Sequence, residues 1–223
     1  MEQKQIKISA FMTAPRYENT WTRNYIEIAL RQAGIPLAVS GGVFYGQCMQ
    51  MMFERAIEEG VDVGLTVDFD SVFTKNHIDL LLSRLCFNDN IDAVASMQCR
   101  RGGKTPLAST GEHKRVDTDG EPIKVRTAHF GLTAIDMHKL KDVPKPWFWS
   151  QPDEKGEWTD NKTDDDIWFW RQWEKAGNSV YLDTTCRIGH LEEVVTHFVE
   201  VDGEYQAIHS YPKDWVGQHA SNV

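Results

Sequence analysis

Hydrophobic and polar positions alternate along the chain with two periods, one typical of strands and one typical of helices. Short apolar segments predict strands at residues 6–12, 36–40, 61–67, 91–97, 125–135, 180–183 and 186–188. Apolar residues at helical spacing predict helices at residues 21–33, 47–59, 76–87 and 163–176. The first of these helices carries Trp21, Tyr25, Ile28 and Leu30. Glycines, which favour helix ends, directly follow three helices at Gly34, Gly60 and Gly177. The pattern predicts an α/β fold with a mixed or parallel central sheet covered by helices on both faces.

Two segments lack this pattern. Periodicity fades over residues 100–121, and a loop of this length usually forms a lid or a binding segment. Past Leu191 the pattern is ambiguous. We therefore expect one domain over residues 1–191 and a C-terminal extension over residues 192–223. Packing on the same domain, closure over the site and self-association are open alternatives for this extension.

Composition indicates an ordinary globular domain. The 223 residues are 41% hydrophobic and 26% charged, which is enough to build one core. Four widely spaced cysteines indicate neither a zinc site nor a disulfide framework. No apolar run approaches the roughly 20 residues of a membrane span, and the first residues do not resemble a secretory signal. We expect a cytoplasmic protein with no membrane partner.

The charge distribution bears on nucleic-acid binding. The net charge of −9 argues against a broad nucleic-acid surface. Residues 98–126 nevertheless carry more lysine and arginine than aspartate and glutamate. A phosphate contact and a solvated loop face both fit this local excess.

Two aspartates follow the predicted strand at residues 61–67. Ligands of open α/β sheets bind beyond the carboxyl ends of the strands, where Asp68 and Asp70 are expected to lie. Mg²⁺ and Mn²⁺ prefer such carboxylate oxygens. The two residues are therefore candidate metal ligands, and a solvated turn is the alternative.

Further candidate groups come later in the chain. Asp165 and Asp166 fall in the first turn of the predicted helix at residues 163–176, where carboxylates stabilise the helix end. A carboxylate held there is also placed to act as a general base. His190 follows Gly189 after the last predicted strand, and it is either a structural residue or a metal ligand.

Together and in this order, these segments resemble the GT-A glycosyltransferases, in particular the small family-2-like enzymes of bacterial and phage genomes. The likeness runs from residue 6 to residue 191 and rests on residues 13–17, 67–70, 129–135, 165–169 and 189–190. Asp165 stands where this family often has glutamate, which leaves the base open between Asp165 and Asp166. For a phage-encoded chain, the expected location is the cytoplasm of the bacterial host.

The resemblance implies a set of roles. Asp70 and His190 would bind Mn²⁺ or Mg²⁺, and Asp68 would contact the ribose or a metal-bound water. The resemblance places further nucleotide-sugar contacts at Thr13, Pro15, Arg16, Tyr17 and Arg101. Contacts to the acceptor are expected at Gly131, Trp147 and Phe148, with core packing as the alternative for the two aromatic residues.

The implied activity is metal-dependent transfer of a sugar from a UDP- or GDP-sugar to an acceptor hydroxyl. The acceptor is open among glycans, small molecules and hydroxylated DNA bases, and the oligomeric state is unknown. Inversion at the anomeric carbon is favoured over retention. A non-catalytic nucleotide-sugar-binding protein is an alternative. A sugar-1-phosphate nucleotidyltransferase is a further one, although residues 13–16 lack the glycines of its phosphate loop.

Overall fold

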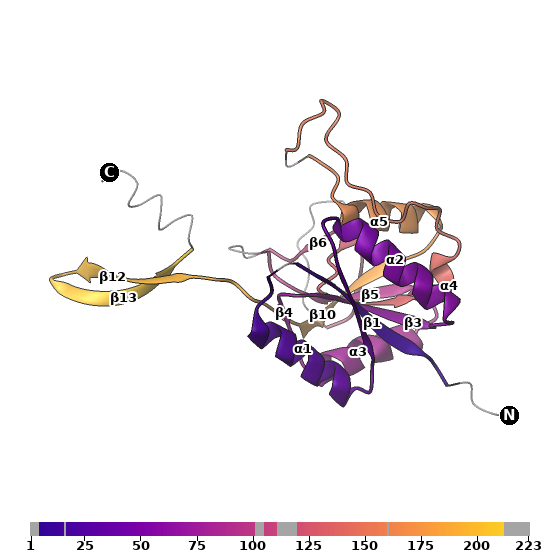
Figure 1. The fold of residues 1–223 in the computed structure, drawn as a ribbon, viewed down its shortest axis with the longest axis horizontal. Coiled ribbons are helices and arrows are strands. Elements are labelled where there is room, and N and C mark those ends of the chain that lie inside the picture. Colours follow the sequence, from indigo (N-terminus) through magenta and orange to yellow (C-terminus); the bar gives the residue numbers. More distant parts are fainter. Residues whose placement is uncertain (1–4, 16, 101–104, 111–119, 160, 212–223) are drawn as a thin grey trace.

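The computed structural model describes residues 5–15, 17–100, 105–110, 120–159 and 161–211. A seven-stranded sheet forms its centre (Figure 1). In spatial order its strands are β2 (Leu37–Gly41), β1 (Ile8–Ala14), β3 (Val63–Asp68), β9 (Leu132–Asp136), β5 (Ala93–Met97), β10 (Val180–Arg187) and β7 (Ile123–Val125). The helices are α1 (Thr20–Gln32), α2 (Tyr45–Glu58), α3 (Lys75–Cys86), α4 (Met137–Leu140) and α5 (Asp165–Lys175).

The sheet is mixed and mostly parallel. Strand β1 pairs in parallel with β2 and β3, and β5 pairs in parallel with β10. Strand β9 runs antiparallel to both of its neighbours, β3 and β5, and β7 runs antiparallel to β10. The strands β2, β1, β3, β5 and β10 therefore share one direction, and their carboxyl ends meet at one edge.

Helices cover both faces of this sheet, as Figure 1 shows. Helices α1 and α3 pack on one face, where Ile26 and Leu81 are fully buried. Helices α2 and α5 pack on the other face, where Phe53 and Trp170 are fully buried. Burying such a side chain stabilises the fold by about 1.5–3 kcal/mol. The predicted α/β fold, with a mixed and mostly parallel sheet between helices, is confirmed.

Local differences from the predicted elements have physical causes. The strand predicted at residues 125–135 is three strands, β7, β8 (Thr127–Ala128) and β9. A turn separates β8 from β9, in which the Gly131 amide donates to His129 Nδ1 over 2.8 Å. The two short strands predicted after residue 180 form the single strand β10, with an irregular register between Asp183 and Arg187. In α1, Trp21 is 72% exposed, and Ile26 and Leu30 face the sheet instead.

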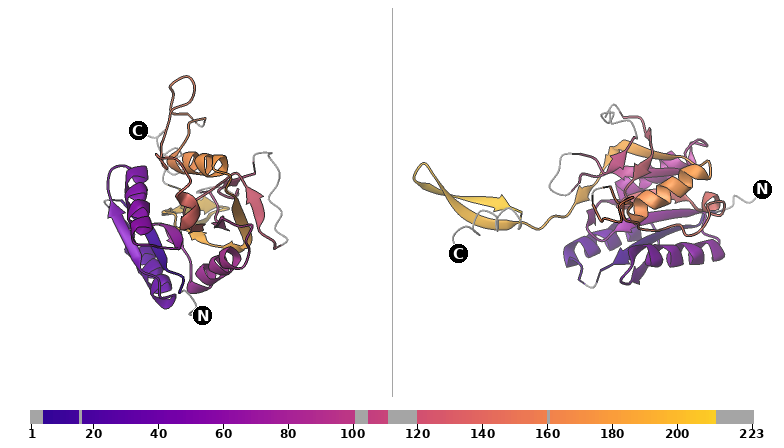
Figure 2. Two further views of the ribbon diagram at one scale, coloured as in Figure 1. Left: turned by 90° about the vertical axis from the view of Figure 1, so that its right-hand side faces the viewer. Right: turned by 90° about the horizontal axis from the view of Figure 1, so that it is seen from above.

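Small sheets complete the described chain. Strand β4 (Ser71–Val72) pairs with β11 (Gly189–His190), and β6 (Ala108–Ser109) pairs with β8. Strands β12 (Val195–Val201) and β13 (Glu204–Ser210) form a hairpin that extends away from the sheet in Figure 1 and in the right-hand view of Figure 2. The domain boundary at residue 191 stays a prediction. Within the described residues, no helix has both the length and the apolarity needed to cross a bilayer.

Candidate active site

A cavity of about 740 Å³ opens where the parallel strands end. Its volume lies within the range of about 300–1,000 Å³ that is usual for ligand sites. Six residues predicted from the sequence line it together: Thr13, Asp68, Asp70, Asp165, Asp166 and His190. The cavity therefore joins the candidate metal ligands and the candidate base in one space.

The short sheet formed by β4 and β11 brings His190 to Asp70. His190 is paired in register with Ser71, the residue after Asp70. Its Nε2 lies 3.2 Å from Asp70 Oδ2, and its Nδ1 lies 3.0 Å from the Cys99 carbonyl oxygen. Because a carbonyl oxygen only accepts hydrogen bonds, Nδ1 carries the proton. In the neutral ring, Nε2 then presents its lone pair toward Asp70.

This pair fits an ion of the Mn²⁺ or Mg²⁺ type. Neighbouring ligands of a six-coordinate ion bound at about 2.1 Å are about 3 Å apart, close to the 3.2 Å between His190 Nε2 and Asp70 Oδ2. Asp68 lines the same cavity and adds a second carboxylate. In the described part of the chain, no three carboxylate, histidine or cysteine side chains are grouped closely enough to hold an ion by themselves.

Gln98 holds the short sheet in place, a role that the sequence analysis missed. Its side chain is 2% exposed, and Nε2 donates to Ser71 Oγ and to the Gly189 carbonyl oxygen, both over 3.1 Å. One amide therefore cross-links β4 to β11 directly beside the Asp70 and His190 pair. A polar residue right after the buried strand β5 was the available signal.

Gly131 is buried behind the cavity wall, and His129 and Phe130 line the cavity instead. A Cβ at Gly131 would lie 2.6 Å from both Gln98 Oε1 and His129 Nδ1. Burial lowers the pKa of His129 to about 4, so the ring is neutral. Its Nδ1 accepts from Gly131, and its Nε2 donates to the Ser96 carbonyl oxygen over 2.7 Å. The absence of a side chain at Gly131 thus serves this packing.

Helix α5 presents two carboxylates to the cavity. The preceding residue, Asp164, is extended and makes no side-chain capping bond. Asp166 Oδ1 accepts from the Ile167 amide over 2.7 Å. Burial, helped by the negative charges of Asp164 and Asp165, raises the pKa of Asp166 from 3.8 to about 6. A carboxylate with a pKa near neutrality is suited to taking up a proton from a reacting hydroxyl.

Tyr45, the first residue of α2, is a second group that the sequence analysis missed. It lines the cavity together with Asp68 and the α5 carboxylates. Burial raises its pKa well above the usual value, and the charges of Asp68, Asp166 and Asp165 raise it further. The phenol therefore stays protonated and can donate a hydrogen bond among these acids.

The other predicted ligand contacts have mixed positions. Pro15 and Tyr17 are exposed after β1, and Tyr17 is not among the residues that line the cavity. Arg16 and Arg101 lie outside the described residues. Arg100, the neighbour of Arg101, lines the cavity.

Trp147 and Phe148 belong to the core. Trp147 is 3% exposed, and its indole N–H donates to the Val143 carbonyl oxygen over 2.8 Å. Phe148 is 5% exposed and stacks on Phe169 with ring centroids 5.1 Å apart. Both side chains are therefore largely packed inside, which favours the core-packing alternative, and their contacts to an acceptor stay a prediction. Their neighbour Trp149 is 51% exposed.

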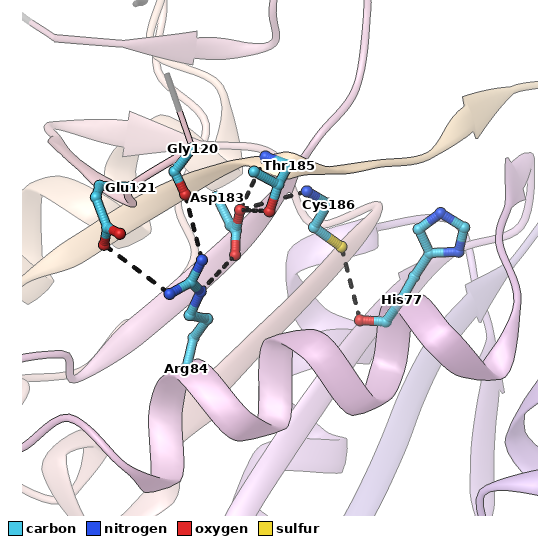
Figure 3. Close-up of polar contacts among 7 residues, drawn as sticks. All are labelled: His77, Arg84, Gly120, Glu121, Asp183, Thr185 and Cys186. Atoms are coloured by element: carbon cyan, nitrogen blue, oxygen red, sulfur yellow. Dashed lines mark hydrogen bonds and ion pairs between the residues drawn. The ribbon is translucent and has the colours of Figure 1, made fainter. Parts of the chain in front are cut away.

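A separate polar cluster has a structural role (Figure 3). Asp183 on β10 is fully buried and lies 3.0 Å from Arg84 Nε on α3. Arg84 also donates to the Gly120 carbonyl oxygen over 3.2 Å, and Asp183 accepts from the amides of Thr185 and Cys186. These bonds join α3, β10 and the residues just before β7.

Comparisons with known proteins show the fold. No protein-family model matches the chain, and no curated protein matches it in sequence. A197 from STIV superposes with a TM-score of 0.59 and 14% identity over 91% of this chain and 93% of A197. GalNAc-T7, solved with UDP, GalNAc and Mn²⁺, superposes with a TM-score of 0.50 and 12% identity over 91% of this chain. The match covers 45% of GalNAc-T7, so the chain spans less than half of that protein.

Proposed function

From the GT-A glycosyltransferase fold of this chain, we propose that it transfers a sugar from a nucleotide-sugar donor to an acceptor hydroxyl with the help of a divalent ion. One observation carries the proposal. A single cavity holds the Asp70 and His190 pair together with Asp166, the carboxylate whose pKa is raised. Transfer needs both functions, because one group assists departure of the diphosphate and another activates the acceptor.

The donor side of the reaction is assigned to the ends of β3 and β11. Asp70 and His190, with Asp68, would hold Mn²⁺ or Mg²⁺. When bound, the ion neutralises the charge that develops on the departing diphosphate. Asp68, which pairs in register with Thr13 near the end of β1, would contact the ribose of a UDP- or GDP-sugar. Because GalNAc-T7 was solved with UDP and Mn²⁺, UDP-sugars are the first donors to test.

The acceptor side is assigned to α5. Asp166 takes the proton from the acceptor hydroxyl as the oxygen attacks the anomeric carbon, a contribution of about 10²–10⁴-fold. This role requires attack opposite the leaving group and therefore inversion. Asp165 would then orient the acceptor. If the product retains the anomeric configuration, Asp166 positions the acceptor and is not a base. NMR of the product distinguishes these two mechanisms.

A donor panel tests the proposed function. UDP- and GDP-sugars are added with and without Mn²⁺, and the melting temperature and the release of nucleoside diphosphate are measured. A donor that binds the native state raises the melting temperature. We expect a rise that needs Mn²⁺ and a slow release of diphosphate that a chelator stops. Release that continues in the chelator would contradict the metal role.

The rival functions give different results in the same assay. A non-catalytic binding protein would show the rise in melting temperature and no diphosphate release with any acceptor. A nucleotidyltransferase would instead release pyrophosphate from a nucleoside triphosphate and a sugar 1-phosphate. Either result would refute the transferase proposal.

A further inference from the structure

A second cavity, of about 600 Å³, adjoins the first. It lies between the start of α2 and the chain that leads from Pro146 to Trp158, and this chain rises above α5 in Figure 1. Ser150 and Asp165 line both cavities, whereas Asp166 lines the first alone. The two spaces therefore meet at Asp165, next to the candidate base.

Exposed aromatic rings distinguish the wall of this second cavity. Phe44, Trp149 and Trp158 are 68%, 51% and 64% exposed, and Met51 beside them is 57% exposed. Large apolar side chains that gather on one surface usually mark a binding site. The core residue Phe148 also lines this cavity.

The polar groups of this wall are uncharged amides, one hydroxyl and one carboxylate. Gln47, Gln50, Ser150 and Asp165 supply them, and no lysine or arginine is among the described residues that line the cavity. An anionic ligand would meet the Asp165 carboxylate with no cation in this wall to offset it. A neutral ligand with many hydroxyl groups fits these donors and acceptors.

The segment that carries Trp149 is fixed by hydrogen bonds on both sides. The Trp147 amide donates to Gln50 Oε1 over 3.2 Å, and the Trp168 indole N–H donates to the Pro146 carbonyl oxygen over 2.9 Å. After Trp149, Gln151 pairs with Thr163 through two backbone bonds of 2.8 and 2.9 Å. A backbone segment held in this way loses little conformational freedom when a ligand binds.

We propose that the second cavity binds the acceptor as a neutral saccharide of at least two rings. The ring that receives the sugar lies between Asp165 and Asp166, and the next ring packs its C–H face against Trp149 or Trp158. Aromatic side chains suit this role because they pair an apolar face with a polar rim. Asp165 hydrogen-bonds the hydroxyls between the two rings and is a positioning residue. The inference rests on the proposed function and narrows its acceptor class.

The test uses a double variant and a matched control. Trp149→Ala with Trp158→Ala removes the two exposed tryptophan rings of the wall, and Trp21→Ala removes an even more exposed tryptophan ring on α1, which lines neither cavity. Binding of maltose, cellobiose, lactose, chitobiose and mannobiose is followed by ligand-observed NMR at millimolar concentration. Because the three side chains are exposed, we expect all variants to keep the melting temperature of the wild type.

The expected result is that at least one disaccharide binds the wild type. The double variant should bind that disaccharide at least about tenfold more weakly. Trp21→Ala should bind like the wild type. The proposal is overturned if none of the disaccharides binds, or if the double variant binds them as the wild type does. A short single-stranded DNA whose binding is lost in the double variant would also overturn it, in favour of a nucleic-acid acceptor.

A donor measurement on the same proteins separates this proposal from the proposed function. The rise in melting temperature with a nucleotide-sugar and Mn²⁺ depends on the first cavity, so the double variant should retain it. Retained donor response without disaccharide binding would refute the saccharide proposal alone. Disaccharide binding without any donor response would refute both, because no acceptor exists without transfer.

Discussion

His190 contacts Asp70 across 120 residues of chain because β11 pairs with β4, and the imidazole Nε2 lies 3.2 Å from the carboxylate Oδ2. We predict that Asp70→Asn lowers metal-dependent diphosphate release by about 100-fold or more, because it removes a charged ligand without changing the volume of the side chain. Asp79→Asn, on the exposed face of α3, is the control. Full turnover of the Asp70 variant in Mn²⁺ would contradict the metal assignment.

The raised pKa of Asp166 predicts how activity depends on pH. Protonation removes the base, so kcat/KM should fall as the pH drops below about 6. The variant Asp166→Asn should lose about 10²–10⁴-fold in turnover and keep its donor response. A pH profile of the wild type that is flat from about pH 5 to 8 would exclude Asp166 as the base.

The same pKa predicts a change in stability of the opposite sign. A carboxyl whose pKa is raised in the native state binds protons more tightly there than in the unfolded chain. The native state therefore loses stability as the pH rises from about 4 to about 6. Asp166→Asn removes this loss, so its melting temperature relative to the wild type should increase across that interval and then stay level. If the difference in melting temperature between the variant and the wild type is the same at all pH values, the native fold does not raise the pKa of Asp166.

Gly46 lets the start of α2 approach α5. A Cβ there would lie 2.6 Å from Phe148 Cβ and 3.0 Å from Asp165 Oδ1. We predict that Gly46→Ala costs about 1–3 kcal/mol in the free energy of unfolding and weakens turnover, because Asp165 is displaced. Gly41→Ala is the control, since its nearest neighbour would be Ala14 O at 3.6 Å. Urea unfolding and diphosphate release measure the two effects.

Arg84 is the cationic partner of the buried Asp183. Arg84→Ala should lower the free energy of unfolding by about 1–3 kcal/mol, because it leaves a buried carboxylate with fewer partners. Adding Asp183→Asn to that variant should restore part of the loss. Arg55→Ala removes an exposed pair with Glu59, which solvent screens, and should change stability much less. Equal effects of the two arginine variants would contradict the structural role of Arg84.

Local periodicity was sufficient for most of the fold. The four long helices and the strands β1, β2, β3 and β5 form within a few residues of their predicted bounds, because each repeats apolar positions with its own period. Pairing between distant segments leaves no such periodic signal. The short sheet of β4 and β11 and the entry of β9 between β3 and β5 could therefore not be predicted.

The same distinction applies to the candidate site. Asp68, Asp70 and Asp166 could be predicted because each carboxylate stands where an element begins or ends. Gln98 and Tyr45 also stand at the ends of elements, but their roles come from partners more than 20 residues away, which the local pattern does not identify. Trp147 shows the converse, since an aromatic residue beside a proline looks the same in the sequence whether it is buried or exposed.

The path of the chain after β11 determines which C-terminal truncations leave the candidate metal site intact. The Leu191 amide donates to the Asp70 carbonyl oxygen over 2.8 Å, and four residues later the chain enters the projecting hairpin. A shortened protein that stops before Gly189 would lose both the His190 imidazole and the hydrogen bond from the Leu191 amide to Asp70. A shortened protein that stops a few residues after Leu191 would keep both groups and would lack only the hairpin of β12 and β13 and the residues after it.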